Sequence, residues 1–113
     1  MSKIVLPTEP ECANISFLAV MHALSDPLRL SIVLSVLCEG EKTCGSFVIQ
    51  APKSTLSHHF RVLRESGVLS TRRQGKELIN TVRKNDLDFL FPGLLDAVIN
   101  GARPVVTSLY PHP

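Results

Sequence analysis

The sequence predicts one mainly α-helical domain with a single β-hairpin, and three observations indicate this class. The 113 residues are enough for one compact domain and too few for two. Apolar residues recur at helical spacing over most of the chain, whereas two β-prone runs flank a glycine. No stretch reaches the roughly 18 consecutive apolar residues that cross a bilayer. We therefore expect a cytoplasmic domain without a membrane partner.

Both ends of the chain are expected to lie outside the domain. Residues 1–11 are predicted to form a flexible N-terminal arm and 102–113 a C-terminal tail, because prolines interrupt both segments. The domain then spans 12–101. Its first helix is predicted over 12–24, where apolar side chains leave few positions polar. One small domain rarely surrounds such a helix, but a second subunit could cover part of it.

A second helix is predicted over 28–38. Asp26 offers a carboxylate to the free amides at its start, and Pro27 at the first helical position loses no hydrogen bond. Gly40 is placed to end the helix in a left-handed conformation. Residues 43–49 can then form one or two helical turns before the next proline, which excludes helical geometry from the residue before it.

The segment 53–66 predicts an amphipathic helix that ends at a glycine, Gly67. Leu56, Phe60 and Leu63 fall on one face at positions i, i+4 and i+7, and most other positions are polar or basic. These spacings indicate a helix that buries one stripe and exposes the rest.

A hairpin and a broken helix complete the predicted order. The β-prone runs 68–73 and 76–82 flank Gln74-Gly75, which predicts a tight turn with basic residues at the tip. The last helix is predicted over 85–101 in two pieces, with a break at Pro92-Gly93.

Charge is distributed unevenly along the chain. Residues 53–84 contain eight Lys and Arg against two Glu, a balance of +6, whereas the remainder has four cations and eight anions. A basic segment on a slightly acidic body is typical of a domain that presents one face to a polyanion.

The order of the central elements is that of a helix-turn-helix followed by a wing. In such a module the second helix enters the major groove of double-stranded DNA, and the hairpin reaches the flanking backbone or minor groove. Ser54 and Thr55 at the start of this helix can donate to phosphates. The cations that would displace counterions are Lys53, Arg61, Arg64, Arg72, Arg73 and Lys76.

The chain contains ALSDPLRL at 23–30, KSTLSHHFRVLRESGVL at 53–69 and RQGK at 73–76. Together these motifs resemble the ArsR/SmtB family of winged-helix transcriptional repressors. The resemblance implies a homodimeric repressor of a palindromic operator, with the dimer interface formed by the first and last helices. It also implies DNA-facing residues on the recognition helix, namely Lys53, Ser54, Thr55, Ser57, His58 and Arg61, and on the wing, namely Arg72, Arg73, Gln74 and Lys76. His59, beside the apolar stripe, is expected to pack or cap.

Metal sensing, which many members of this family perform, lacks its usual ligands here. The arsenite-type motif needs two cysteines separated by one residue, but the chain has Thr43-Cys44-Gly45. The zinc-type site needs Asp and His pairs on the last helix, which has Asp86, Asp88 and Asp96 but no histidine. We therefore expect no metal site and no cofactor.

The three cysteines leave a thiol switch open. Cys38 and Cys44 lie on either side of the Gly40 turn, and Cys12 is a third member from the first helix. A buried free cysteine, however, is commonly just a small apolar side chain. Release from the operator by thiol modification, release by a small organic effector and the absence of any effector remain alternatives.

No catalytic function is predicted, because no Ser-His-Asp or Cys-His order and no phosphate-binding glycine loop is recognisable. The expected function is sequence-specific DNA binding by a transcriptional regulator. The alternative is a winged helix that serves as a protein-interaction adapter without operator binding. The Ser, Thr, His, Lys and Arg side chains between 53 and 76 favour DNA, since an adapter would more often expose apolar anchors there.

Overall fold

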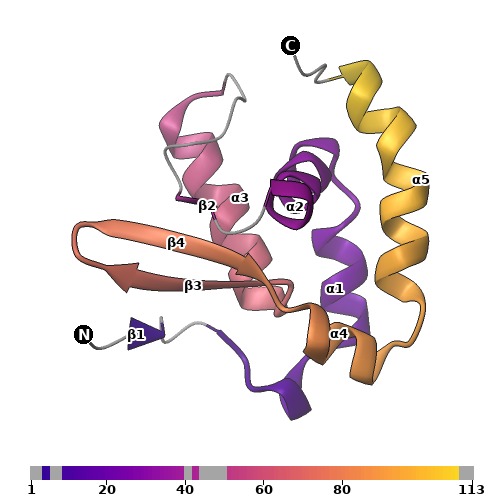
Figure 1. The fold of residues 1–113 in the computed structure, drawn as a ribbon, viewed down its shortest axis with the longest axis horizontal. Helices are drawn as coiled ribbons and strands as arrows, with labels where there is room; N and C mark the ends of the chain where they lie inside the picture. Colours follow the sequence, from indigo (N-terminus) through magenta and orange to yellow (C-terminus); the bar gives the residue numbers. More distant parts are fainter. Residues whose placement is uncertain (1–3, 6–8, 40–41, 44–50, 110–113) are drawn as a thin grey trace.

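The computed structural model describes residues 4–5, 9–39, 42–43 and 51–109. The elements in this part of the chain are β1 (Ile4–Val5), the 3-10 helix η1 (Cys12–Asn14), α1 (Phe17–Ala23), α2 (Pro27–Glu39), β2 (Lys42–Thr43), α3 (Lys53–Ser66), β3 (Leu69–Gln74), β4 (Glu77–Val82), α4 (Lys84–Leu90) and α5 (Leu94–Leu109) (Figure 1). The predicted class is confirmed: five helices and a β-hairpin follow each other in winged helix-turn-helix order.

Strands β3 and β4 form the predicted hairpin, which we call the wing (69–82). Gln74 lies opposite Glu77, so the two-residue loop is Gly75-Lys76, one residue later than the predicted Gln74-Gly75, because Gln74 still pairs in β3. Gly75 has a φ of 64° and Lys76 has no positive φ. This combination is that of a type II′ turn, whose first loop position favours glycine.

The N-terminal arm, predicted to be flexible, is tied to the wing. β1 pairs with β3, Ile4 lying opposite Arg73, and the antiparallel sheet has the order β1-β3-β4-β2. The Glu9 carboxylate accepts hydrogen bonds from the Ser70 hydroxyl (2.9 Å) and the Thr71 amide (2.7 Å). The physical reason is that an outer strand presents unpaired backbone groups, which the arm satisfies.

The first predicted helix, 12–24, is interrupted in the structure. Between η1 and α1, Ile15 has an extended backbone (φ −72°, ψ 120°) and a buried side chain. This break places Ile15 in the core beside Gly67, where a Cβ atom would come within 2.7 Å of the Ile15 Cγ1. Ser16 then begins α1 and accepts a hydrogen bond from the Ala19 amide (3.3 Å).

Helix α2 begins as the sequence predicts. Pro27 is its first residue, and the Asp26 Oδ2 accepts a hydrogen bond from the Arg29 amide (3.0 Å). The helix runs to Glu39. The glycine predicted to end it, Gly40, lies outside the described residues.

The short helix predicted over 43–49 does not begin at Thr43. This residue lies in β2, opposite Ile79 of β4, because its backbone pairs with the outer edge of the wing. Residues 44–50 lie outside the described part of the chain, so the rest of this prediction stays untested.

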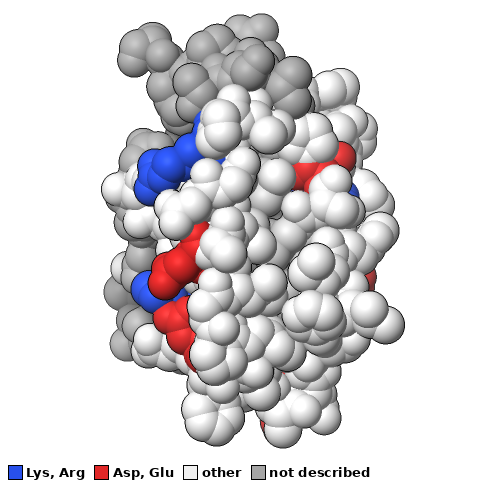
Figure 2. Space-filling view, turned by 90° about the vertical axis from the view of Figure 1, so that its right-hand side faces the viewer, with Lys and Arg blue, Asp and Glu red and all other residues white. Residues whose placement is uncertain are grey.

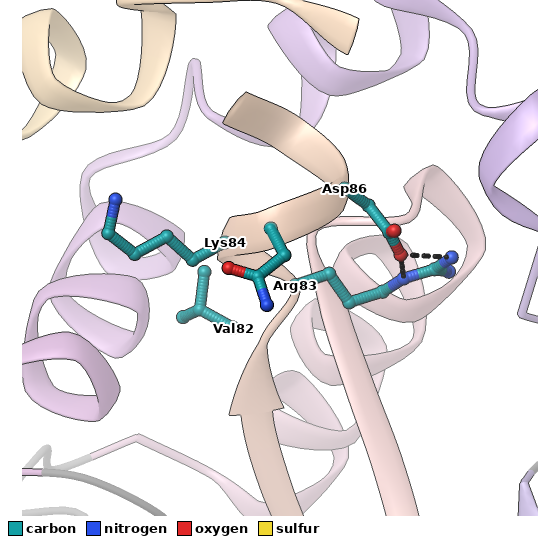
Figure 3. A pocket seen from close by; sticks show the side chains of 5 residues that line it. Val82, Arg83, Lys84 and Asp86 are labelled. Atoms are coloured by element: carbon teal, nitrogen blue, oxygen red, sulfur yellow. Dashed lines mark hydrogen bonds and ion pairs between the residues drawn. The ribbon is translucent and has the colours of Figure 1, made fainter. Parts of the chain in front are cut away.

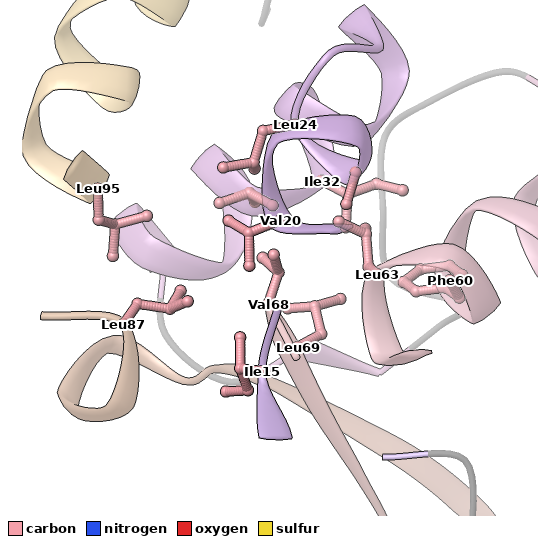
Figure 4. Packing of buried hydrophobic residues seen from close by; sticks show 12 residues of the cluster. Ile15, Val20, Leu24, Ile32, Phe60, Leu63, Val68, Leu69, Leu87 and Leu95 are labelled. Carbon is pink, nitrogen blue, oxygen red and sulfur yellow. The ribbon is translucent and has the colours of Figure 1, made fainter. Parts of the chain in front are cut away.

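A single main core fixes α3 and the wing (Figure 4). Its fully buried side chains come from α1 to α5 and the base of the wing, and include Val20, Ile32, Leu63, Val68, Leu69, Leu87 and Leu95. The predicted stripe of α3 points into this core, with Phe60 and Leu63 buried and Leu56 packed at its edge. Gly67 ends α3 with a φ of 89°, as predicted.

Helix α5 continues for about two turns past its predicted end at Gly101, so most of the predicted tail is helical. The helix includes Pro104, and a proline inside a helix costs about 3 kcal/mol. Burial of Ala102 and Val106 against Leu34 of α2 offsets this cost. The predicted break before α5 is confirmed, and α4 and α5 meet there at 115°. No single helix among the described residues is long and apolar enough to cross a membrane.

Candidate nucleic-acid interface

Helix α3 turns one face to the core and the opposite face to solvent. Six residues predicted to face DNA lie on this helix, and Thr55 alone among them is half-buried. The exposed ones are Lys53, Ser54, Ser57, His58 and Arg61. Because the buried stripe sets the rotation of the helix about its axis, these polar side chains are held outward. We call them, with Thr55, the α3 polar face.

The start of α3 also presents backbone donors. Pro52 precedes the helix and offers no side-chain cap to its first amides. These amides lie at the positive end of the helix dipole, where a phosphate oxygen is favoured. The α3 polar face thus places cationic side chains beside the first backbone amides of the helix.

The wing carries the other four predicted residues, and the structure separates them into two kinds. Arg73, Gln74 and Lys76 are exposed at the tip, whereas Arg72 is half-buried opposite Ile79 and interacts within the protein. Successive side chains of a strand point to opposite faces of a sheet. Arg73 is therefore a better placed phosphate contact than Arg72, a distinction that the sequence did not make.

The wing and α3 lie on the same side of the molecule. Residues of α3 contact β3, and both elements project away from α5 (Figure 1). Two groups of side chains that are separate in the sequence, the α3 polar face and the wing tip, therefore approach a duplex from one direction.

The end of the predicted basic segment does not belong to this surface. Arg83 pairs with Asp86 at 2.9 Å (Figure 3). It also donates to the Pro10 carbonyl at 2.6 Å. Lys84 pairs with Asp88 within α4. These two cations hold the N-terminal arm and α4 in place, so the charge available to a polyanion comes from α3 and the wing.

His58 and His59 are adjacent but have different surroundings. His58 is exposed, whereas His59 is half-buried, with its Nδ1 3.0 Å from the Arg29 Nη1. Burial lowers the pKa of His59, the charges of Arg29 and His58 lower it further, and Asp26 opposes the shift. The prediction that His59 packs within the protein is confirmed.

Arg29 is the residue that the sequence analysis missed. It is 6% exposed and bonds to backbone carbonyls of α1 as well as to His59. The sequence did contain a signal for this role, because Arg29 is the single cation in the otherwise mostly apolar helix predicted over 28–38. A charged side chain is rarely buried in a core unless it is hydrogen-bonded or paired.

The predicted thiol switch is only partly within the described residues. Cys38 is exposed near the end of α2, Cys12 is half-buried in η1, and Cys44 lies outside the described part. Partial burial and the neighbouring Asp86 carboxylate raise the pKa of Cys12, which lowers its thiolate fraction and its reactivity. Among the described residues, no group of three or more His, Cys, Asp or Glu side chains is arranged to hold a metal ion.

Comparison with known proteins identifies relatives of this fold and site. A family model described as "Bacterial regulatory protein, arsR family" matches residues 26–71, from the start of α2 into β3. The uncharacterized HTH-type transcriptional regulator YceK of Bacillus subtilis is 32% identical over 82 residues, which cover 70% of this chain and 82% of that protein. The transcriptional repressor SdpR of Bacillus subtilis is 31% identical over 77 residues, which cover 63% and 84%. The HTH-type transcriptional repressor SmtB of Mycobacterium tuberculosis is 27% identical over 89 residues, which cover 77% and 63%.

The matched segment, 26–71, contains all of α2 and α3 and ends within β3, so it includes the α3 polar face but not the wing tip. The similarity to YceK and SdpR extends over more than four-fifths of each relative, and so beyond the helix-turn-helix itself. The order of the elements, the polar face of α3 and the sequence similarity therefore all indicate the same family. The chain belongs to the ArsR family of helix-turn-helix transcriptional regulators.

Proposed function

We propose that this DNA-binding regulator is a dimeric repressor that places α3 in the major groove and the wing tip on the flanking backbone or minor groove. The observation that carries the proposal is the orientation of α3. Its apolar stripe is locked into the core at Phe60 and Leu63, while its opposite face exposes Lys53, His58 and Arg61. A major groove is wide enough for such a helix.

The residues of the interface have different proposed roles. Ser57 and His58, one turn inside α3, contact base edges and determine which sequence is preferred. Ser54 and Thr55, beside the first-turn amides, bind phosphate, and Arg73 at the wing tip adds a phosphate contact without sequence information. Of the remaining predicted residues, Lys53, Arg61, Gln74 and Lys76 supply charge and polar contacts along the duplex, whereas half-buried Arg72 interacts within the protein.

The apolar surface supports a dimer formed through the first and last helices. Large apolar side chains are exposed on α1, α4 and α5: Phe17, Leu18, Met21, Phe89 and Val105. On the side where α5 lies, Figure 2 shows a broad area with few charged residues. Exposed apolar patches of this kind mark association surfaces. A two-fold dimer would present two copies of α3 about 34 Å apart, one turn of DNA, and so prefer a palindromic operator.

The proposal is tested by the salt dependence of DNA binding. Replacing Arg73 by Ala should weaken binding to a selected duplex and to random duplex DNA alike, and reduce the slope of log K against log salt by about 0.9 per lost contact. Fluorescence anisotropy at several salt concentrations measures both quantities. Lys84→Ala is the matched control, because this cation pairs with Asp88 outside the interface and its loss should leave the slope unchanged.

A second variant separates sequence preference from charge. Ser57→Ala should change the duplexes recovered from a randomised pool while leaving the salt slope as in the wild type. If the wild-type protein binds no duplex in a salt-dependent way, operator binding is wrong and the interaction-adapter alternative takes its place. An unchanged slope in the Arg73 variant would instead remove the wing from the interface.

For release from DNA, the proposed switch is modification of Cys38, acting with Cys44 or Cys12. Cys38 supports this because its side chain is exposed, whereas the raised pKa of Cys12 makes that thiol the weaker candidate. Operator affinity of the wild type and of Cys38→Ser, each with and without oxidant, tests the switch. Equal responses of the two proteins would reject it and leave a small organic effector or no effector.

A further inference from the structure

Arg29 joins three elements through one buried guanidinium. Its Nε donates to the Ala23 carbonyl (2.7 Å) and its Nη2 to the His22 carbonyl (3.2 Å), both at the end of α1. Its Nη1 lies 3.0 Å from the Nδ1 of His59 on α3. The side chain therefore links α1, α2 and the recognition helix at one point.

The arrangement suits a buried cation. The last carbonyls of α1 form the negative end of that helix, which stabilises a guanidinium placed against them. The planar fork of an arginine can direct separate N–H groups at separate acceptors, which a lysine cannot do in the same geometry. Two of the three contacts thus fix Arg29 against α1, and its Nη1 faces His59.

The bond between Arg29 and His59 requires a neutral imidazole. A guanidinium has donors only, so the Nδ1 of His59 must accept and the ring proton must reside on Nε2. Protonation of Nδ1 would remove the acceptor and place two cations about 3 Å apart. One proton therefore decides whether this contact attracts or repels.

The charged and titratable groups around His59 favour the neutral form on balance. Arg29 of α2 and His58 of α3 disfavour a positive ring, and Asp26, at the start of α2, favours one. Partial burial is the largest effect and acts in the same direction as Arg29 and His58, so the pKa of His59 lies below its usual value. The His58 ring, with its centroid 5.4 Å away, belongs to the α3 polar face.

We propose that Arg29 and His59 are a positioning pair that sets the orientation of α3 for DNA binding, and that protonation of His59 weakens binding by releasing this orientation. The proposal rests on the proposed placement of α3 in the major groove. His59 itself contacts no DNA in this scheme. Its effect is exerted on the adjacent His58 and on the turn of α3 that carries Ser57.

The experiment compares DNA affinity from about pH 5 to about pH 8 for the wild type and His59→Asn, with one labelled duplex selected by the wild type. Asparagine places a carbonyl oxygen near the position of Nδ1 but does not titrate. The wild-type dissociation constant should rise below the pKa of His59, by up to about tenfold per pH unit, and that of His59→Asn should lack this rise. Both proteins retain His58, so the two differ only at residue 59.

Two further variants test positioning. His59→Ala should bind about tenfold more weakly than the wild type at about pH 8, because the acceptor is lost, and His59→Asn should restore most of this affinity. His22→Asn is the matched control, since its side chain is exposed and only its carbonyl serves Arg29; its pH profile should match the wild type. Circular dichroism at each pH confines the comparison to folded protein.

The outcomes separate this proposal from the proposed function. Parallel pH profiles for the wild type and His59→Asn, with normal salt-dependent binding, would overturn the positioning pair and leave operator binding intact. Equal affinities of His59→Ala and the wild type at about pH 8 would overturn it as well. Absence of DNA binding by the wild type at every pH would instead contradict the proposed function.

Discussion

Two independent constraints, the backbone conformation and the packing against Ile15, both require a glycine at position 67. Its φ of 89° is left-handed, and a Cβ atom there would lie 2.7 Å from the Cγ1 and 2.9 Å from the Cδ1 of Ile15. The left-handed conformation could be predicted from the sequence, because a glycine directly follows the amphipathic helix 53–66. The contact with Ile15 could not be predicted, since Ile15 is distant in the chain and its local sequence predicts a continuous helix over 12–24.

Gly67→Ala is expected to destabilise the protein by about 2–4 kcal/mol, from left-handed strain together with overpacking against Ile15. Urea denaturation followed by circular dichroism measures the loss. Gly75→Ala is the control, because Gly75 has a φ of 64° but no atom within 4 Å of its Cβ position, so it should lose only about 1–2 kcal/mol. Equal losses at both sites would show that contact with Ile15 contributes nothing.

At the scale of elements, the arm and the wing form one unit. Glu9 bonds to Ser70 and Thr71 on β3, while within the wing the Thr71 hydroxyl donates to the buried Asn80 Oδ1 at 2.7 Å. These bonds satisfy polar groups at the base of the hairpin, next to the core. The orientation of the wing therefore depends on a segment that the sequence suggested to be free.

Glu9→Ala is expected to lower the free energy of unfolding by about 1–3 kcal/mol, because the Thr71 amide loses a charged acceptor. The direct measurement is hydrogen exchange, in which the Thr71 amide should lose protection. Glu11→Ala removes an exposed carboxylate from the same arm and should change neither quantity. Unaltered protection at Thr71 in the Glu9 variant would mean that the arm does not order the wing.

At the scale of the whole molecule, polar and apolar surfaces are separated. α3 and the wing project to one side, away from α5 (Figure 1), and the exposed apolar side chains lie on α1, α4 and α5. A single copy leaves Leu18 76% exposed and Phe89 79% exposed. In the proposed dimer, this separation would leave both copies of α3 accessible to DNA.

Leu18→Glu is expected to shift the protein from dimer to monomer and to weaken operator binding, because a carboxylate would be buried between subunits. The folded monomer should tolerate it, since the side chain faces solvent there. Sedimentation velocity measures the assembly state. Gln74→Glu adds the same charge at the wing tip and should leave the assembly state unchanged. A wild-type protein that sediments as a monomer at micromolar concentration would contradict the dimer.

The sequence by itself determined the elements whose causes are local. The start of α2 at Asp26, the buried stripe of α3, the end of α3 at Gly67 and the turn at Gly75 each depend on residues within about one turn of one another. The polar residues of α3 could be identified for the same reason, because a stripe that must be buried leaves its opposite face exposed.

Only the tertiary structure decided the contacts that join distant segments. Arg29 and His59 are 30 residues apart, and Glu9 and Thr71 are 62 apart, so no local pattern indicates either bond. Burial also overrode local preference where Ile15 breaks the first helix and where Ala102 and Val106 carry α5 through Pro104. The physical reason is the same for the two bonds, for the break at Ile15 and for the extension of α5. Each depends on a free energy of packing or pairing that exists only after the chain has folded.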